Sequence, residues 1–598
     1  MTTPYDADLV ALLADASFDR HTPPPAAAAP YPEPAAWAYE GLRRITAAVG
    51  GGKPLLADHR RLRALLELTA ITDPVLFHVT FLHHCMTVGP ALDYGATAAD
   101  IAELTSGSAM GAALMTELGQ GNSDADIRTE ATYDARTREF VLHTPGPEAA
   151  KYPPNVGLPG VPRLAVVSAR LQAGGADRGT CLFLVPLQDA RAPHPGVVIH
   201  RRPPTALLPL DYATVSFDRV RVPHHRWLAD GATIDPNGVF RDPLADPPTR
   251  TGRSLSMSRF ACGAVTAGLA AAARAGVSIA LRHAGRRRTH DRLAGAVPAL
   301  AHHNQRRLLF GALAQAFAAT ALARAATRDS WEIPDGGGRG HGPGPGAMRR
   351  FALAKTAADR LAEEAISRSR SAAGAAAFFS ENRLVDYHAL AMAFRSACGD
   401  NQLILLDAAR SMAAGIDYAP PTEDAPDHWL RLFRARERLL HAELTAALRA
   451  AEALGIDAFT AWDTHTDLAQ RFAEAHLARV TAEAAHAAYR PGEPPSGSAT
   501  DIRAQLYQLF CLEEITAHSG WYHEAGLLTV EDTRALPDRL AHTCRTLMPR
   551  LDETQAVLDV PSALTRGPLA GPDYVADLYA QLEERPPPFP CPGRGHTV

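Results

Sequence analysis

Lysine, paired cysteine and long apolar runs are scarce in this sequence, and each scarcity excludes a class of protein. Only Lys53, Lys151 and Lys355 are lysines among the 60 lysines and arginines, and the net charge is −5 over 598 residues. A clustered basic surface for nucleic acid or anionic lipid is therefore not expected. The seven cysteines are scattered, odd in number and contain no CxxC pair, which argues against a disulfide framework and a structural zinc site.

Targeting and membrane signals are also missing. The N-terminus has neither the basic nor the apolar region of a secretory signal. No uninterrupted apolar run approaches the roughly 20 residues that span a bilayer, and the final Arg-Gly-His-Thr-Val is not a peroxisomal address. The sequence predicts a cytoplasmic protein with no membrane or nucleic-acid partner.

The hydrophobic periodicity predicts a mainly helical protein with a small central antiparallel β domain. A chain of 598 residues needs several cores. We expect an N-terminal helical domain, a β domain, a central helical bundle, a C-terminal helical bundle and a loose tail, at 1–110, 111–232, 250–415, 428–562 and 563–598. The predicted strands are 139–143, 164–171, 180–186, 196–200 and 212–222. The predicted helices after the β domain include 257–282, 308–327, 351–370, 401–412, 472–489, 502–518 and 536–558.

A glycine-broken loop, Thr-Glu-Leu-Gly-Gln-Gly-Asn-Ser at 116–123, begins the β domain. Gly119 and Gly121 let the backbone approach a flat ligand, and Thr116 and Ser123 offer hydroxyls. Because Gly-x-Gly loops are common, the motif taken alone is more typical of an ordinary turn into a strand.

This loop and several later segments resemble the acyl-CoA oxidase family. The resemblance continues through Lys-Tyr-Pro-Pro-Asn at 151–155, Ser-Phe-Asp-Arg-Val-Arg-Val-Pro at 216–223 and Leu-Phe-Cys-Leu at 509–512, in the family's order, and covers about residues 60–560. It includes the second helical bundle, which distinguishes such oxidases from the shorter acyl-CoA dehydrogenases. The resemblance implies the acyl-CoA oxidase fold, FAD as cofactor, an acyl thioester on CoA or a carrier protein as substrate, and molecular oxygen as acceptor.

The resemblance also assigns the flavin ring its neighbours. Thr116 would hydrogen-bond the ring, Gly119, Gly121 and Ser123 would line its approach, and Asn155 stands where the family has a glycine beside the flavin. Tyr152 and Pro153 replace two tryptophans, so the aromatic wall is thinner here.

A second group would hold the FAD pyrophosphate. By resemblance, Arg287 reaches it across a dimer interface with help from Gln305, and arginine suits a bidentate phosphate contact. The alternative interpretation of Arg286–Arg288 is a solvated helix end that complements the helix dipole.

Three histidines look metal-like but predict no metal site. His83 and His84 lie about 100° apart on a helix, so they do not converge with His78 on one ligand. We interpret all three as core or cleft residues.

The sequence departs from the family at the base. Where the family has a glutamate, the run Arg-Ser-Ala-Cys-Gly-Asp-Asn at 395–401 has Cys398. Removing the α-proton of an acyl thioester requires a base within hydrogen-bond reach in a water-poor pocket, and an unperturbed thiol is mostly neutral at pH 7.

Three interpretations of Cys398 stay open. It is an inert buried thiol, or a thiolate stabilised by Arg259 or Arg395, or it is replaced by another carboxylate such as Asp400 or Asp407. The position that some relatives use on the preceding helix is Ser258 here. Arg259 is also our candidate for contacting the substrate.

The leading hypothesis is an FAD-dependent oxidoreductase of the acyl-CoA oxidase or dehydrogenase type, in fatty-acid or secondary metabolism. A homodimer is expected, with a heteromer as the alternative. Two other functions stay open: a noncanonical flavin monooxygenase on the same fold, and an inactive subunit that binds FAD or acyl-CoA.

Overall fold

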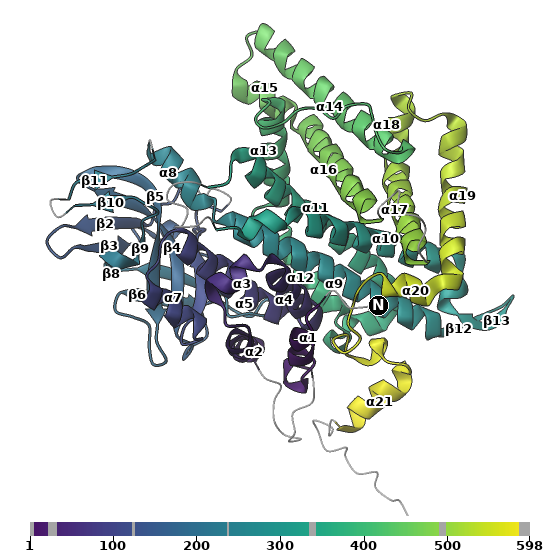
Figure 1. Cartoon of the computed structure of the whole chain (residues 1–598), viewed down its shortest axis with the longest axis horizontal. Helices are drawn as coiled ribbons and strands as arrows, with labels where there is room; N and C mark the ends of the chain where they lie inside the picture. Colours follow the sequence, from purple (N-terminus) through teal and green to yellow (C-terminus); the bar gives the residue numbers. More distant parts are fainter. Residues whose placement is uncertain are drawn as a thin grey trace, which may run out of the picture.

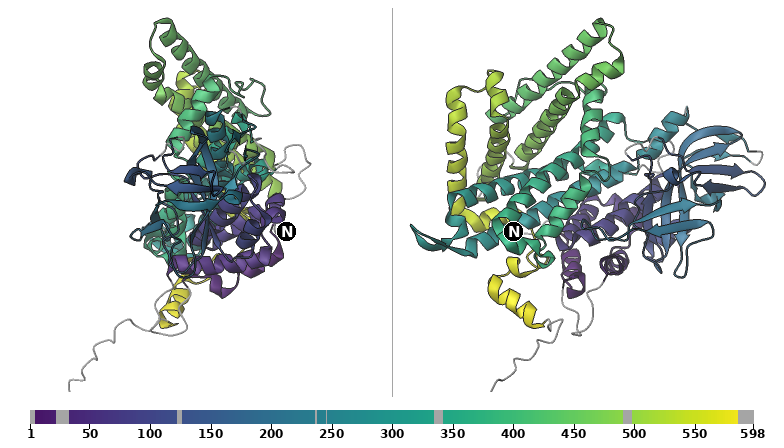
Figure 2. Two further views of the ribbon diagram at one scale, coloured as in Figure 1. Left: turned by 90° about the vertical axis from the view of Figure 1, so that its left-hand side faces the viewer. Right: turned by 180° about the vertical axis from the view of Figure 1, so that it is seen from behind.

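The expected order of helices, β domain, helices and second helical bundle is present in the computed structural model (Figure 1). The structure describes residues 5–21, 33–121, 126–235, 238–244, 246–333, 342–489 and 498–584. The β domain lies at one end, long central helices cross the middle, and the second bundle stands on their far half, as the reversed view in Figure 2 also shows. The predicted fold class is confirmed.

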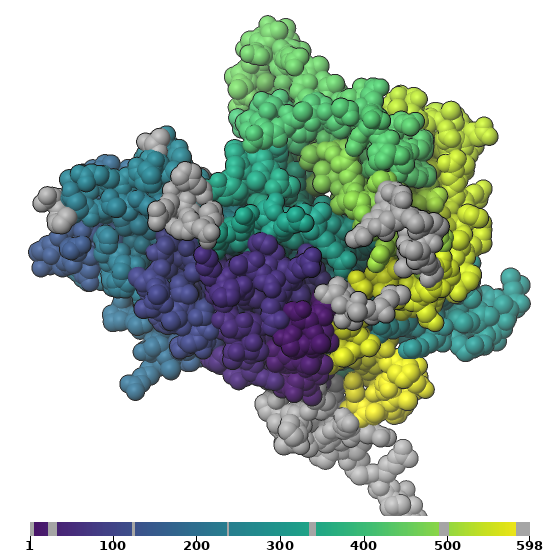
Figure 3. Space-filling model, in the orientation of Figure 1, coloured from purple at the N-terminus to yellow at the C-terminus, as the bar shows by residue number. Residues whose placement is uncertain are grey.

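The N-terminal helices lie between the β domain and the C-terminal segment on the face drawn in Figure 3. Local sequence sets their starts: the Asp58 carboxylate accepts from Arg61 N at 3.0 Å, and Asp73 accepts from Val75 N at 2.8 Å, so each caps a helix. A π-helical turn at His84–Val88 joins the helix Pro74–His83 to the short helix Gly89–Asp93. The helices are α1 Ala7–Leu13, α2 Pro34–Val49, α3 Gly52–Ala57, α4 His59–Thr72, α5 Pro74–His83, α6 Gly89–Asp93 and α7 Ala98–Thr105.

The main sheet of the β domain is mixed, so the expectation of a purely antiparallel domain is wrong. β1 pairs in parallel with the first half of β4, and β2 pairs in parallel with its second half. These two strands therefore lie end to end along one side of β4, and the glycine-broken loop leaves the sheet between them. The sheet consists of β1 Met110–Leu114, β2 Glu130–Asp134, β3 Glu139–His143, β4 Arg163–Ala173, β5 Ala176–Gln188, β8 Val220–Pro223 and β9 Trp227–Leu228.

The connections explain this pairing. The predicted turn after Asp134 is confirmed, because the Asp134 side chain accepts from Arg136 N at 3.0 Å and joins β2 to β3 as a hairpin. The long connection 144–162 then returns the chain so that β4 runs parallel to β2, which a short turn cannot do. The predicted strand 212–222 divides at Arg219, whose φ is +51°. Smaller ladders pair β6 Val197–Arg201 with β7 Ala213–Phe217, and β10 Thr233–Ile234 with β11 Phe240–Arg241.

The central bundle is built around α9, which is almost wholly buried because small residues let its neighbours approach closely. A Cβ added at Gly268 would lie 2.3 Å from the Phe77 ring, so glycine is required at this crossing. A hairpin of β12 Arg288–Asp291 and β13 Gly295–Pro298 projects beyond the end of α9 (Figure 1). The helices are α8 Pro247–Leu255, α9 Ser258–Arg286, α10 His303–Ala326, α11 Pro345–Ala373, α12 Leu384–Phe394 and α13 Asn401–Ala413.

Three helical stretches are long and apolar enough to cross a membrane by length and composition, contrary to the expectation from uninterrupted runs. They are Pro74–Asp93, Pro247–Arg286 and His303–Ala326, and 89%, 100% and 83% of their most apolar windows are buried inside the protein. Apolar residues, mainly alanine in the two longer stretches and valine, leucine and phenylalanine in Pro74–Asp93, keep the mean hydropathy high although polar residues interrupt each stretch.

The second bundle corrects two further expectations. The predicted helix 536–558 ends at Leu547 and resumes at Leu551, because Pro549 lies in the intervening single turn. The start of the expected loose tail is packed, since Leu564 and Leu569 are buried and the Arg566 guanidinium donates to the Asp15 carbonyl, whereas Val575 and Tyr579 in its last helix are exposed. The helices are α14 His428–Ala453, α15 Ala458–Thr464, α16 Thr466–Tyr489, α17 Ser498–Ala517, α18 Ser519–Glu524, α19 Val530–Leu547, α20 Leu551–Ala556 and α21 Tyr574–Glu584.

Candidate active site

The glycine-broken loop is hydrogen-bonded to the segment that contains Tyr152. Thr116 O accepts from Tyr152 N at 3.0 Å, and Leu118 N donates to Ala150 O at 2.9 Å. Beneath them a buried ion pair joins Lys151 Nζ to Glu117 at 2.9 Å. Although burial opposes ionisation, the ammonium and the hydrogen bonds from Thr129 hold the pKa of Glu117 below its usual range. The buried Lys151–Glu117 ion pair, which has no net charge, therefore supports the loop.

The two loop glycines have different surroundings. A Cβ at Gly119 would lie 2.5 Å from the Glu148 Cβ, whereas none of the described atoms lies within 4 Å of one at Gly121. Gly119 thus lets the loop pack closely against Glu148, and the space next to the Gly121 Cα is open. Thr116 is half-buried between them and β1. Ser123 lies outside the described residues.

Asn155 is buried and connects this loop region to the helices. Its Oδ1 lies 3.0 Å from His78 Nε2, and its carbonyl accepts from the Tyr39 hydroxyl at 3.3 Å. Its amide nitrogen, close to Tyr212, makes no hydrogen bond of normal geometry within the described chain. Burial lowers the pKa of His78 to about 4, so this imidazole is neutral near pH 7. Tyr152, joined to Pro153 by a cis peptide bond, is half-buried.

Cys398 occupies a strained turn between α12 and α13, which we call the Cys398 turn (395–401). Its φ is +56°, in the left-handed region that non-glycine residues rarely adopt, and the next residue, Gly399, has φ +91°. Asn401 N closes the turn by donating to Arg395 O at 3.0 Å. Strained backbone of this kind is concentrated at functional sites.

A buried lysine holds the turn from below. Lys355 Nζ donates to Phe394 O, to Gly399 O at 2.8 Å and to Asn401 Oδ1 at 2.9 Å. These three acceptors match the three N–H groups of an ammonium. Burial lowers the pKa of Lys355, and nearby Asp359 and Cys398 oppose that shift.

One helical turn along α11, Asp359 completes a group that we call the lysine cluster (Lys355, Asp359 and Asn401). Asn401 Nδ2 donates to Asp359 Oδ2 at 2.6 Å, while Oδ1 of Asp359 is buried and has no hydrogen-bond partner among the described residues. Burial raises the pKa of Asp359 to about 6.

Aromatic packing joins the lysine cluster to Asn155. The Phe394 ring, whose carbonyl accepts from Lys355, lies 5.8 Å from the His78 ring, and His78 contacts Asn155. The Cys398 turn and the edge of the glycine-broken loop thus lie on opposite sides of one buried aromatic group.

The carboxylates expected to replace the base have other roles. Asp400 caps α13, since its Oδ1 accepts from Gln402 N at 2.9 Å, and Asp407 is exposed on the same helix. Arg395 pairs with Glu363 at 2.6 Å and is exposed. Their expected roles, as a replacement base for Asp400 and Asp407 and as a partner of a thiolate for Arg395, stay predictions.

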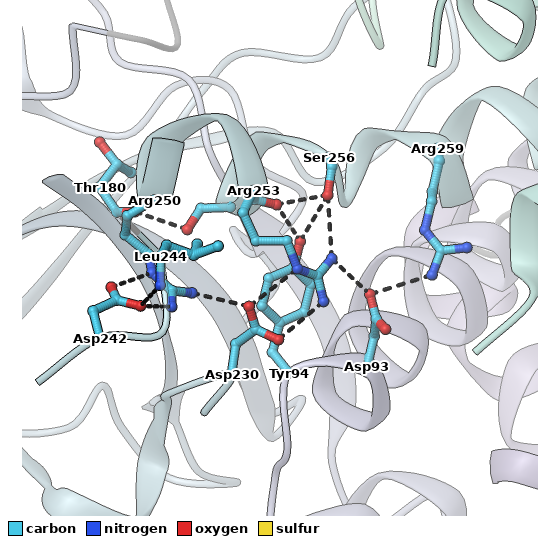
Figure 4. A network of polar contacts seen from close by, with 11 residues as sticks. Asp93, Tyr94, Thr180, Asp230, Asp242, Leu244, Arg250, Arg253, Ser256 and Arg259 are labelled. Atoms are coloured by element: carbon cyan, nitrogen blue, oxygen red, sulfur yellow. Dashed lines mark hydrogen bonds and ion pairs between the residues drawn. The ribbon is translucent and has the colours of Figure 1, made fainter. Parts of the chain in front are cut away.

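Arg259 belongs to a buried ion network rather than to a substrate contact (Figure 4). Its guanidinium donates to Asp93 Oδ2 at 3.2 Å and to the Glu332 carbonyl at 2.7 Å. Asp93 also accepts from Arg253, which continues through Asp230 to Arg250. Three domains meet here, because these side chains come from the N-terminal helices, the end of the β domain and the start of the central bundle. The network explains Arg259 structurally.

Arg287 and Gln305 lie at the far end of α9. Arg287 is exposed directly after the helix, and one of its terminal nitrogens lies 3.8 Å from where a Gly374 Cβ would be. Gln305 is half-buried near the start of α10. A helix of 29 residues is about 44 Å long. A single chain therefore does not bring these residues to the β domain, which contains Thr116 and Asn155 and lies at the opposite end of the molecule from β12 and β13 (Figure 1).

The metal-like histidines are core residues. His83 Nδ1 accepts from Gly111 N at 2.9 Å, and His83 packs edge-to-face on His84. Elsewhere the side chains of His21, Asp73 and Asp386 place ligand atoms within 4.8 Å of one another. Arg20 pairs with both carboxylates, so this group is an ion-pair cluster.

Sequence reasoning missed the lysine cluster. The available signal was a charged pair, Lys355 and Asp359, spaced four apart on the predicted helix 351–370. One of only three lysines in the chain stands on what periodicity makes an inward face.

Comparison with known proteins identifies relatives along the whole chain. The family model described as acyl-CoA oxidase matches residues 425–551, which is the second bundle. The mouse protein "Acyl-coenzyme A oxidase-like protein" is 24% identical over 494 residues, covering 76% of this chain and 77% of that protein. Rabbit "Peroxisomal acyl-coenzyme A oxidase 2" is 32% identical over 208 residues, covering 34% of this chain and only 30% of that relative.

Solved structures share the fold. Acyl-CoA oxidase-2 of Caenorhabditis elegans, solved with FAD, ascaroside-CoA and ATP, has a TM-score of 0.78 at 19% identity and covers 98% of this chain and 93% of that one. Acyl-CoA oxidase3 of Yarrowia lipolytica has a TM-score of 0.79 at 18% identity, over 98% of this chain and 89% of that one. These solved structures show that the chain has the fold of the acyl-CoA oxidases, and the family model shows that its second bundle is similar to theirs.

Proposed function

We propose that this protein is an FAD-dependent oxidoreductase that dehydrogenates the α,β-bond of an acyl thioester. The observation that carries the proposal is that the acyl-CoA oxidase fold presents two separate groups of residues, which we call half-sites, one suited to a flavin ring and one suited to a pyrophosphate. One half-site lies where the glycine-broken loop leaves the β sheet between β1 and β2, and the other lies at the far end of α9.

The residues at the first half-site fit a flavin ring. The buried Asn155 amide is a donor without a partner of normal geometry in the described chain, and Gly121 leaves open space beside Thr116. A flavin edge carries carbonyl and nitrogen acceptors that such donors would satisfy, and leaving a buried donor unmet costs about 1–3 kcal/mol. When bound, FAD would accept hydride from the substrate β-carbon and pass the electrons to molecular oxygen.

The residues at the second half-site fit a pyrophosphate. Arg287 is exposed, and the lack of a side chain at Gly374 leaves its guanidinium open to a ligand. Since one chain holds the half-sites apart, a complete FAD site requires two chains, with Arg287 and Gln305 reaching the ring site of a partner. A homodimer meets this requirement, and a heteromer with a related chain is the alternative.

The substrate class follows from the relatives. The C. elegans structure is described as bound with FAD and ascaroside-CoA, which supports a CoA thioester here. A thioester on a carrier protein is the alternative, and the two differ only beyond the reacting carbons.

The test is anaerobic mixing of the purified protein with CoA thioesters. We expect a yellow dimer whose flavin bleaches with butanoyl-, octanoyl- or palmitoyl-CoA and recovers with hydrogen peroxide release when oxygen is admitted. A colourless protein that does not take up FAD would contradict the proposal. Bound flavin that no thioester bleaches, but that forms a hydroxylated product once chemically reduced in oxygen, would favour a monooxygenase.

A further inference from the structure

Asp359 differs from the other buried carboxylates of the described chain in one respect. Nine of the ten form an ion pair with arginine or lysine within 4.0 Å, and Asp359 does not. The nine are Glu67, Asp73, Asp93, Asp100, Glu117, Asp211, Asp230, Glu437 and Glu514. A buried carboxylate is normally paired because ionisation in a low dielectric is otherwise costly.

The position of Asp359 matters more than its lack of a pair. Lys355, one turn earlier on α11, holds the carbonyls on both sides of Cys398, and Asn401 on α13 bridges Lys355 to Asp359. The carboxylate therefore lies against the Cys398 turn. Through Phe394 and His78 this turn packs toward Asn155, the ring half-site of the proposed function.

The two carboxylate oxygens are in different environments. Oδ2 accepts from Asn401 at 2.6 Å, which fixes the side chain, and Oδ1 has no partner among the residues that the structure describes. Asn401 is itself oriented by Lys355, so the anchoring amide cannot rotate without losing a hydrogen bond. One oxygen is held and the other is available to accept a proton.

We infer that Asp359 is the base that removes the α-proton of the acyl thioester in place of the glutamate that Cys398 replaces. The inference rests on the proposed function. The α-C–H bond breaks, its proton goes to Oδ1, and its electron pair forms the Cα–Cβ double bond as hydride leaves the β-carbon for FAD. On this assignment Cys398 contributes small volume over the turn, which leaves the acyl group room to reach a carboxylate set further back on α11.

The ionisation of Asp359 suits this role. Burial raises its pKa to about 6, so it is ionised at neutral pH and still basic enough to accept a proton. The charged groups that face it are Lys355 and Glu363 on α11 and Arg395 in the Cys398 turn; Lys355 in turn faces Cys398, Asp400 and Cys262 of α9. Lys355 favours the carboxylate, and Glu363 opposes it.

The main test is the rate of anaerobic flavin bleaching by octanoyl-CoA at pH 8. Removing a general base typically costs 10²–10⁴-fold, so Asp359→Asn should bleach at least about 100-fold more slowly at unchanged FAD content. The matched control, Glu364→Gln, changes a carboxylate on the same helix that pairs with Arg368, and should stay within about 2-fold. If Asp359→Asn bleaches as fast as Glu364→Gln, the assignment is wrong although the proposed function stands.

A second variant guards against loss of folding. Cys398→Glu, introduced into Asp359→Asn, returns a carboxylate to the turn and should restore at least about 10-fold of the bleaching rate. The role of Asp359 would be overturned if no thioester bleaches the FAD bound to the wild-type protein while a thioester does bleach the FAD bound to Cys398→Glu. In that case the site can still support thioester dehydrogenation, but Asp359 is not its base. If neither bleaches, the proposed function fails, and the inference fails with it.

A readout without turnover completes the test. In protein freed of FAD and labelled with ¹³C-aspartate, one carboxyl resonance should titrate near pH 6 and vanish in Asp359→Asn. A resonance lost from Asp359→Asn that titrates below pH 4 would contradict the assignment, because such a carboxylate is too weak a base.

Discussion

The two fully buried lysines of this protein stand in opposite kinds of site. Lys151 contacts the Glu117 carboxylate directly at 2.9 Å, and Glu117 also accepts from Arg128 N at 2.8 Å and from Thr129. Lys355 donates to two backbone carbonyls and to the side-chain oxygen of Asn401, and Asp359 accepts only from the side-chain nitrogen of Asn401 among the described residues. The pKa of Glu117 is held low and that of Asp359 is raised to about 6.

The comparison teaches that proximity of opposite charges does not decide whether a buried pair is structural. What decides is where the ammonium's three N–H groups point. At Lys151 the ammonium donates to the Glu117 carboxylate as well as to Met115 O at 3.2 Å and Ser168 Oγ at 3.0 Å, so it neutralises the carboxylate of the loop directly. At Lys355 the N–H groups secure the backbone of a strained turn, and the carboxylate nearby keeps its basicity.

The largest expected loss of stability follows from breaking the Lys151–Glu117 ion pair. Glu117→Gln leaves a buried ammonium without its counterion, and breaking a buried pair in this way costs about 3–5 kcal/mol. Urea unfolding should show that loss. Glu148→Gln, on the exposed segment facing the same loop, should change the free energy of unfolding by less than about 0.5 kcal/mol. Equal effects would mean that the pair contributes nothing.

Removing the other lysine should cost less. Lys355→Met leaves the carbonyls of Phe394 and Gly399 and the Asn401 amide without their donor, but it also removes the cost of burying a cation, so we expect a loss of about 2–3 kcal/mol. The pKa of Asp359 should rise above 6, because its nearest positive charge is gone. Lys53→Met, at an exposed lysine, is the control for unfolding. A destabilisation larger than that of Glu117→Gln would reverse the comparison.

Neutralising Asp359 should stabilise the protein, and only above pH 4. Its pKa of about 6 exceeds the 3.8 of an unfolded aspartate, so the folded state binds the proton more tightly and wild-type stability falls as pH rises from about 4 to 6. Asp359→Asn should therefore match wild type near pH 4 and exceed it by about 1–2 kcal/mol at pH 8. Thermal unfolding at the two pH values measures the difference. A variant less stable than wild type at pH 8 would show that the carboxylate is structural.

The smallest effect concerns Asp400. Asp400→Ala removes the cap of α13 and should cost about 1 kcal/mol, whereas Asp400→Asn should cost less because asparagine also caps. Flavin bleaching per bound FAD should stay close to wild type in Asp400→Asn. A loss of bleaching as large as that of Asp359→Asn would return Asp400 to the list of bases.

Much of the fold was predictable because it depends on local patterns. Helices such as α9, α10, α13 and α16 lie close to their predicted ranges, and β3 coincides with its prediction. The errors are non-local. Parallel pairing of β1 and β2 with β4 depends on how the chain returns through 144–162, and periodicity carries no information about that path. The packing of Leu564 and Leu569 depends likewise on distant partners.

The site was less predictable than the fold. The ring and pyrophosphate residues came from family resemblance, and their roles remain predictions. By family resemblance Cys398 stands where a glutamate base is expected, but nothing in the local sequence indicated where another carboxylate would be. Arg259 could not be excluded as a substrate contact until Asp93, 166 residues away, was found against it.

The sequence by itself determined the resemblance to the acyl-CoA oxidases, the order of the helical and β regions and the presence of cysteine at position 398, because these are properties of residue identity and spacing along the chain. Only the tertiary structure decided which buried carboxylate remains without an ion pair. Whether a carboxylate is paired depends on which hydrogen-bond acceptors bind the nearby ammonium and guanidinium groups. Here Lys355 binds carbonyl and amide oxygens because α11 packs against the Cys398 turn and α13, a contact that exists only in the folded molecule.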